Sequence, residues 1–125
     1  RVQDEMIAGL RFWLDLGIDG FRLDAVPYLF ARERTNCENL PETHQSLQRL
    51  RKETDAYHPD PVLLAEGNQW PKDAVAYSGD LAARGDACHT AVAFPVTPRV
   101  LIAVRPTHGH ARLRGSVSST AAAAP

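Results

Sequence analysis

The stretch DGFRLDAV, residues 19–26, is a strand-like apolar run that contains an arginine and an aspartate two positions apart, Arg22 and Asp24. Side chains alternate between the two faces of a strand. One face would carry Gly20, Arg22 and Asp24, and the other Phe21, Leu23 and Ala25. We expect a strand over Ile18–Val26 whose apolar face packs against helices. A buried aspartate on the opposite face costs several kcal/mol unless a cation offsets its charge, and Arg22 is the cation nearest to Asp24.

Helical patterns flank this strand on both sides. Over residues 3–16 apolar side chains recur every three or four positions, which predicts an amphipathic helix ended by Gly17. Its apolar stripe consists of Met6, Ile7, Leu10, Trp13 and Leu14. After the irregular stretch ARERTNCENLP, Pro41 fits the first turn of a second helix that continues to Tyr57.

The stretch PVLLAEGNQW, residues 61–70, predicts a second strand. Val62–Ala65 is an apolar run too short for a helix, and we place Glu66 as the last residue of this strand. A strand, a helical connection and a second strand form a βαβ crossover, which joins parallel neighbours. The predicted fold class is therefore α/β.

The remaining segments carry weaker signals. We expect a short helix over Lys72–Tyr77 and a further strand over Thr90–Phe94. The stretch PRVLIAVR, residues 98–105, fits either a strand or the start of a helix.

Both predicted strands end at an acidic residue. Neighbouring strands lie about 4.7 to 4.9 Å apart, so Asp24 and Glu66 could approach the roughly 5 to 5.5 Å separation of the carboxyl groups in a retaining glycosidase. Arg22 favours the ionised form of Asp24, which suits a nucleophile, whereas no cation adjoins Glu66 in the sequence, which suits a proton donor. Parallel α/β folds build sites at this edge. An alternative of equal weight is structural: Arg22 and Asp24 pair for packing, and Glu66 caps the next helix.

The segments GFRLDAV and LLAEGNQW, about forty residues apart, resemble the second and third signature segments of the α-amylase family, glycoside hydrolase family 13. The resemblance implies a TIM (β/α)8 barrel, of which this α/β chain would be the third helix through the fifth or sixth strand. It further implies that Asp24 is the nucleophile, that Arg22 positions it and that Glu66 is the general acid and base. Residues 1–104 would then form a partial catalytic domain.

The wider sequence narrows the resemblance. The stretches TNCENLPETH and LLAEGNQWP are similar to the trehalose synthase group of this family, which implies retaining glucosyl transfer from maltose to trehalose. On this basis Asn68 and Gln69 are candidate sugar contacts, although Asn68 could equally start a helix. Two alternatives stay open. The same residues would hydrolyse α-glucosides with water as acceptor, or the chain is an inactive fragment, since the family's Asn-His and His-Asp segments are absent from it.

The resemblance also implies a structural calcium ion near Tyr28 and the Leu29 carbonyl, with no other cofactor. Position 31, where we expect an acidic ligand, is alanine. His108 and His110 lack the further ligands of a metal site. They lie in residues 105–125, which we expect to be an unstructured or foreign tail.

Composition limits the partners. A net charge of −1 and a pI near 6.6 argue against nucleic acid or a polybasic membrane contact, and leave neutral molecules such as sugars. The sequence contains no apolar run of roughly 18 residues, so we expect a cytoplasmic protein. Cys37 and Cys88 lie outside any CxxC pattern, and we expect free thiols. The oligomeric state stays open.

Overall fold

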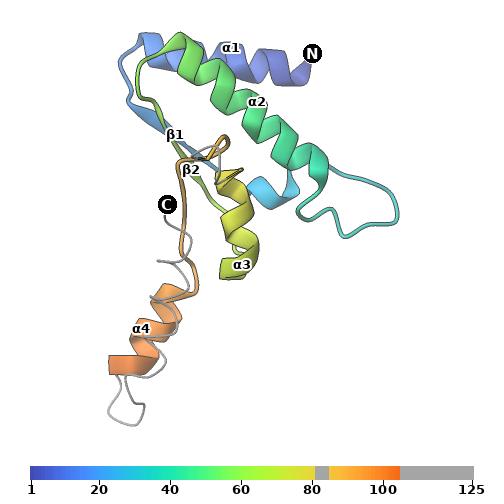
Figure 1. Ribbon diagram of the computed structural model, residues 1–125, viewed down its shortest axis with the longest axis vertical. Helices are drawn as coiled ribbons and strands as arrows, with labels where there is room; N and C mark the ends of the chain where they lie inside the picture. The colour runs from blue at the N-terminus through green and yellow to red at the C-terminus, as the bar shows by residue number, and fades with distance from the viewer. Residues whose placement is uncertain (81–84, 105–125) are drawn as a thin grey trace.

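A three-stranded parallel sheet in the order β1-β2-β3 organises the computed structural model, which describes residues 1–80 and 85–104 (Figure 1). Its elements are α1 (Val2–Asp15), β1 (Gly20–Leu23), the 3-10 helix η1 (Val26–Tyr28), α2 (Pro41–Tyr57), β2 (Val62–Ala65), α3 (Pro71–Ala74), the 3-10 helix η2 (Val75–Ser78), β3 (Thr90–Ala91) and α4 (Val96–Val104). The parallel pairing of β1 with β2 across α2 confirms the predicted crossover and the α/β class. The predicted tail and its two histidines lie outside the described residues.

Strand β1 is shorter than the predicted strand over Ile18–Val26. It ends at Leu23 because the chain turns at Ala25, which has a left-handed φ of 48°. Alanine is not a residue that favours turns, so this turn leaves no signal in the sequence. At the start of the strand the close approach to β2 requires glycine. A Cβ on Gly20 would lie 2.2 Å from the carbonyl oxygen of Val62.

The two faces of β1 differ as the alternation predicts. Phe21 and Leu23 are partly buried against the core, whereas Arg22 is exposed. The core itself consists of Val26, Leu47, Leu63, Ala65, Tyr77, Ala87 and Cys88. The predicted burial of Asp24 is wrong: its side chain, which follows directly after the strand, is 73% exposed. Charge compensation of a buried group is therefore not the reason for the Arg22–Asp24 pair.

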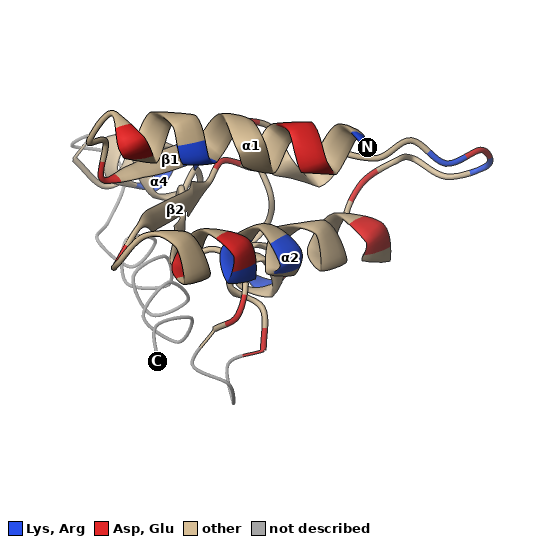
Figure 2. Ribbon diagram, turned by 90° about the horizontal axis from the view of Figure 1, so that it is seen from above, with Lys and Arg blue, Asp and Glu red and all other residues tan. Residues whose placement is uncertain are grey.

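Helices α1 and α2 lie side by side above the sheet and run in the same direction (Figure 2). Three side-chain pairs join them in the same order along both helices, namely Asp4–Arg49 at 2.5 Å, Arg11–Glu53 at 2.7 Å and Asp15–Tyr57 at 2.8 Å. These pairs are at least partly exposed, so each contributes little to stability. Their regular order shows that the polar faces of the two helices are in register, as neighbouring helices of successive βα units must be.

The apolar stripe predicted for the first helix divides into two. Ile7, Leu10 and Leu14 are buried. A second stripe stays exposed, and it consists of Val2, Met6, Trp13 and Leu16. A groove of about 490 Å³ lies beside it, lined by residues of α1, β1 and α2. Within residues 1–80 and 85–104, β1 pairs with a strand along one edge only. This side of the sheet is therefore both apolar and open.

We expect the isolated chain to be poorly stable or to aggregate, because an open strand edge and an exposed apolar face both favour association. Urea unfolding followed by circular dichroism tests this. We expect a broad transition with a slope below about 1 kcal/mol per molar urea. A cooperative transition with a slope of roughly 1 to 3 kcal/mol per molar would contradict the expectation.

Two variants on α1, one on its exposed stripe and one on its buried stripe, form a matched pair that tests this expectation. Met6→Gln lies on the exposed stripe and should reduce light scattering while leaving the far-ultraviolet spectrum unchanged. Leu10→Gln lies on the buried stripe and should remove residual structure, because it buries an unpaired amide.

The later elements settle what the pattern left open. The stretch PRVLIAVR falls mostly in helix α4, with Pro98 in its first turn, where a missing N–H costs nothing. The predicted helix over Lys72–Tyr77 is α3 followed by η2, and the predicted strand over Thr90–Phe94 is the shorter β3. Both cysteines are free, as predicted. None of the helices formed by the described residues is long and apolar enough to cross a membrane.

Candidate functional site

Asp24 and Glu66 lie opposite one another where β1 and β2 end. The register pairs Leu23 with Ala65, and each acid follows directly after its strand, so Glu66 is not the last strand residue that we expected. The parallel pairing continues past the strands: the Glu66 N–H donates to the Leu23 carbonyl at 2.9 Å, and the Val26 N–H donates to the Glu66 carbonyl at 2.9 Å. Two backbone hydrogen bonds thus fix the position of Glu66 relative to the chain around Asp24.

One guanidinium group joins the two carboxylates. Nη2 of Arg22 lies 2.9 Å from Oδ1 of Asp24 and 3.7 Å from Oε2 of Glu66. These oxygens are separated by no more than the sum of the two distances. This upper bound allows the separation of roughly 5 to 5.5 Å between the carboxyl groups of retaining glycosidases. It barely reaches roughly 6.5 Å, the shortest separation in inverting enzymes. No cation adjoins Glu66 in the sequence, but strand pairing brings Arg22 to it in the structure.

A backbone donor holds the Glu66 side chain in place. The Ala25 N–H donates to Oε2 of Glu66 at 2.8 Å, and the left-handed turn at Ala25 aims this N–H. Left-handed alanine costs about 1 to 2 kcal/mol, and such strain is typical of functional sites. The Glu66 side chain is 18% exposed, whereas that of Asp24 is 73% exposed. The partly buried Glu66 is therefore held by a backbone donor, whereas Asp24 is exposed.

The structural alternatives for two site residues are wrong. The residue at the N-terminal cap of α3 is Trp70, and no side chain caps this helix. Glu66 therefore does not cap it, and Asn68 does not start it. Gly67 separates these two residues, and a Cβ there would lie 2.9 Å from Cγ of Pro27. The segment after β2 thus packs tightly on η1 and then leads outward to Asn68.

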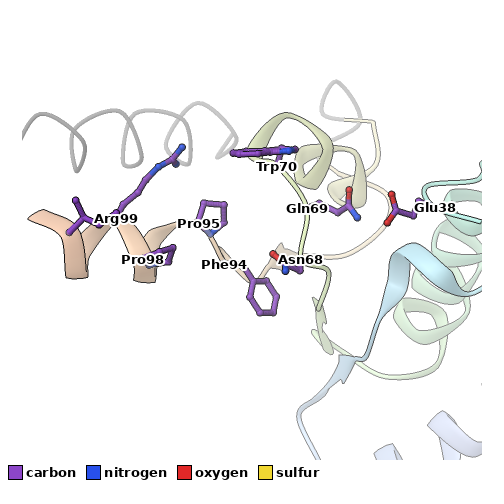
Figure 3. Close-up of a pocket in the computed structure, with 9 residues that line it drawn as sticks. Glu38, Asn68, Gln69, Trp70, Phe94, Pro95, Pro98 and Arg99 are labelled. Atoms are coloured by element: carbon purple, nitrogen blue, oxygen red, sulfur yellow. The ribbon is translucent and has the colours of Figure 1, made fainter. Parts of the chain in front are cut away.

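An open cleft of about 910 Å³ begins two residues beyond Glu66 (Figure 3). Its polar part comes from Glu38, Asn68, Gln69 and Arg99, and its apolar part from Trp70, Phe94, Pro95, Pro98 and Ile102. Asp24 and Glu66 are not among the lining residues. Apolar walls with a few amide and charged groups are typical of small-molecule sites. Both predicted sugar contacts, Asn68 and Gln69, thus lie in this cleft.

A hydrogen-bonded asparagine that the sequence did not single out connects the cleft to the core. Nδ2 of Asn39 donates to Oε1 of Gln69 at 3.1 Å, and the hydroxyl of Tyr77 donates to Oδ1 of Asn39. Burial raises the pKa of Tyr77 to about 12, so its hydroxyl stays protonated. In the sequence Asn39 is one of several polar residues in the irregular stretch, and only its place directly before Leu40-Pro41 marks it.

The calcium ion that the resemblance implies near Tyr28 and the Leu29 carbonyl stays a prediction. The Tyr28 hydroxyl donates to Oε1 of Glu38 at 2.5 Å, an interaction that raises the pKa of Tyr28. Across residues 1–80 and 85–104, no three His, Cys, Asp or Glu side chains are grouped so as to hold a metal ion. Tyr28 and the Leu29 carbonyl alone do not make a calcium site, and no chemical step below uses one.

Comparison with known sequences gives relatives that are named as trehalose synthases. The chain is 66% identical over 104 residues to a trehalose synthase/amylase of Mycolicibacterium smegmatis, covering 83% of this chain and 18% of that protein. It is 54% identical over 95 residues to a trehalose synthase of Thermus thermophilus, covering 75% of this chain and 9% of that protein. A glucosylglycerate phosphorylase of Escherichia coli is more distant, at 35% over 100 residues. The chain thus spans less than a fifth of these relatives.

Comparison with solved structures shows the fold. The α-glucosyl transfer enzyme XgtA matches with a TM-score of 0.74 at 24% identity, covering 99% of this chain and 26% of that one. The trehalulose synthase MutB of Pseudomonas mesoacidophila matches with a TM-score of 0.73 at 20% identity, covering 97% of this chain and 24% of that one. The family model of the alpha-amylase catalytic domain matches residues 1–98. The chain therefore belongs to the alpha-amylase family, as a part of its catalytic domain.

Proposed function

We propose that this chain is the part of a trehalose synthase that carries the nucleophile and the general acid, and that the whole protein converts maltose to trehalose with retention. In this proposal residues 1–104 are the third helix through the fifth or sixth strand of a (β/α)8 barrel. The contact of Arg22 with both Asp24 and Glu66 supports the proposal, because it keeps the two carboxylates close enough to allow the separation found in retaining enzymes. The relatives named trehalose synthase support the choice of substrate.

In the first step Asp24 acts as the nucleophile. One of its oxygens bonds to the anomeric carbon of the non-reducing glucose of maltose while the bond to the glycosidic oxygen breaks. Glu66 gives its proton to that oxygen, so that glucose leaves as a neutral molecule. Arg22, which contacts the Asp24 carboxylate, orients it for the attack.

In the second step Glu66, now a carboxylate, acts as the base. It takes the proton from the anomeric hydroxyl of the released glucose. The oxygen of that hydroxyl then bonds to the anomeric carbon of the glucosyl unit on Asp24, and the ester bond to Asp24 breaks. Trehalose results, and no cofactor is consumed. With water as the acceptor the same steps give two molecules of glucose. Retention of the first glucose in the site therefore determines whether transfer or hydrolysis occurs.

A chimera tests the proposal. Residues 1–104 of this chain would replace the matched 104-residue segment of the Mycolicibacterium smegmatis enzyme, to which they are 66% identical. We expect the chimera to convert maltose to trehalose, with trehalose exceeding free glucose in the product mixture. A folded chimera that forms mainly glucose would favour hydrolysis. A folded chimera without any activity on maltose would contradict the proposal.

The inactive-fragment hypothesis concerns the chain by itself. Direct assay of the 125-residue chain on maltose, beside its Asp24→Asn variant, addresses it. We expect no difference between the two, because the family's remaining segments are absent from this sequence. Turnover above the variant would overturn this expectation.

A further inference from the structure

We propose that Asn39 is a positioning residue that sets which end of the Gln69 amide faces the cleft. The inference rests on the proposed function, because it assigns to Gln69 a hydrogen-bond donor for an oxygen of the sugar. Neither residue touches Asp24 or Glu66 through an interaction among the described residues. The expected effect is therefore on sugar binding and not on the chemical steps.

Asn39 connects three segments that are distant in the sequence. Its N–H donates to the Pro27 carbonyl at 3.1 Å, in the 3-10 helix that follows β1. Its Nδ2 donates to Gln69 Oε1 at 3.1 Å, and its Oδ1 accepts from the Tyr77 hydroxyl. The backbone of Asn39 is left-handed, with a φ of 54°, which asparagine adopts more readily than most residues. Asparagine thus suits both the backbone and the side-chain contacts at this position.

The buried tyrosine determines the orientation of the Asn39 amide. Tyr77 is 1% exposed, and among the described residues Asn39 Oδ1 is the acceptor recorded for its hydroxyl. A buried hydroxyl proton without an acceptor costs about 1 to 3 kcal/mol, so the oxygen of Asn39 stays turned to Tyr77. Its Nδ2 then faces Gln69 and takes Oε1 of that amide as acceptor.

The consequence for the cleft is a fixed donor. Because Oε1 of Gln69 is held by Asn39, its Nε2 group is left to the cleft, where no hydrogen bond to another described residue is recorded for it. Figure 3 shows the Gln69 amide between Trp70 and Glu38 at the rim of the cleft. An N–H donor at this place fits a ring or glycosidic oxygen, which can only accept, as well as a hydroxyl. A glucoside, the ligand class of the proposed function, supplies such oxygens.

The test reverses the polarity of the amide without removing a hydrogen bond. In the Asn39→Asp chimera a carboxylate oxygen still accepts from Tyr77, and the other can accept only from Nε2 of Gln69, which turns Oε1 to the cleft. Gln69→Glu has the same effect on the cleft. One carboxylate oxygen of the new side chain still accepts from Nδ2 of Asn39, and the other faces the cleft in place of the Nε2 donor. We expect each variant to raise KM for maltose by about three- to tenfold, the effect of one lost hydrogen bond, with kcat within twofold.

A double-mutant cycle separates positioning from a structural role. In a Gln69→Ala background Asn39→Asp should leave KM unchanged, because there is no amide to turn. A structural role of Asn39 would instead lower kcat or the fraction of folded protein equally in both backgrounds. An inactive parent chimera would overturn the proposed function together with this inference. An active parent in which Asn39→Asp leaves KM unchanged, or changes it equally in both backgrounds, would overturn this inference alone.

Discussion

Asp24→Asn in the chimera is expected to lower the conversion of maltose to trehalose by on the order of 10⁴-fold or more, the scale of removing a catalytic nucleophile. An amide oxygen is a poor nucleophile and cannot form the glycosyl ester. The replacement has nearly the same shape, and its oxygen can still accept from Arg22, which lies 2.9 Å from Oδ1 of Asp24. Initial rates of trehalose formation, with the folded fraction checked by circular dichroism, measure the effect.

Asp19→Asn is the matched control. Asp19 is exposed, precedes β1 and contributes to the pairing with β2 only through its carbonyl, which accepts from the Val62 N–H. The variant should keep activity within about twofold, since surface substitutions of this kind usually change stability by no more than about 0.5 kcal/mol. If Asp24→Asn kept the conversion rate of the parent, the nucleophile would have to be another residue.

Much of the fold was predictable because the sequence is locally consistent. The period of the first helix, Gly17 at its end, Pro41 at the start of α2 and the short apolar run of β2 all favour the elements that form. Strand alternation correctly separated Arg22 from Phe21. The turn at Ala25 was not predictable, since its left-handed φ follows from how η1 packs and not from the residue. The end of β1 was therefore placed three residues too late.

The candidate site was predictable in its residues and less so in its electrostatics. Two acids after two parallel strands indicated the pair Asp24 and Glu66. The contact between Arg22 and Glu66, which are 44 positions apart in the sequence, depends on the strand register and leaves no local pattern. The link from Asn39 to Gln69 and Tyr77 is equally non-local. Long-range hydrogen bonds of single polar side chains have no periodicity, and this is why sequence reasoning missed them.

Glu66→Gln is expected to have an effect that depends on the leaving group. With maltose the glycosidic oxygen leaves only when protonated, so the variant should lose about 10²- to 10⁴-fold in rate, the usual contribution of general acid catalysis. With α-glucosyl fluoride, whose leaving group needs no proton, formation of the ester on Asp24 should stay within about tenfold of the parent. The ratio of the two losses therefore reports proton donation separately from substrate binding.

The contacts of Glu66 indicate that Glu66→Gln should not disturb the surrounding backbone. The amide oxygen of the replacement can still accept from the Ala25 N–H, which donates to Oε2 of Glu66 at 2.8 Å, so the turn after β1 should stay intact. Glu5→Gln, at an exposed position in the first turn of α1, is the control and should leave both substrates unaffected.

The second step gives an independent measure of the same residue. Without a base the glucosyl ester should accumulate, and azide, an anion that needs no deprotonation, should attack it and give α-glucosyl azide with retained configuration. Equal losses on maltose and on the fluoride, with no azide product, would mean that Glu66 acts through the backbone of β1 and Arg22 and not as the acid. In that case the partly buried carboxylate, held at once by Arg22 and the Ala25 N–H, would have a positioning role, and the proton donor would have to come from another part of the barrel.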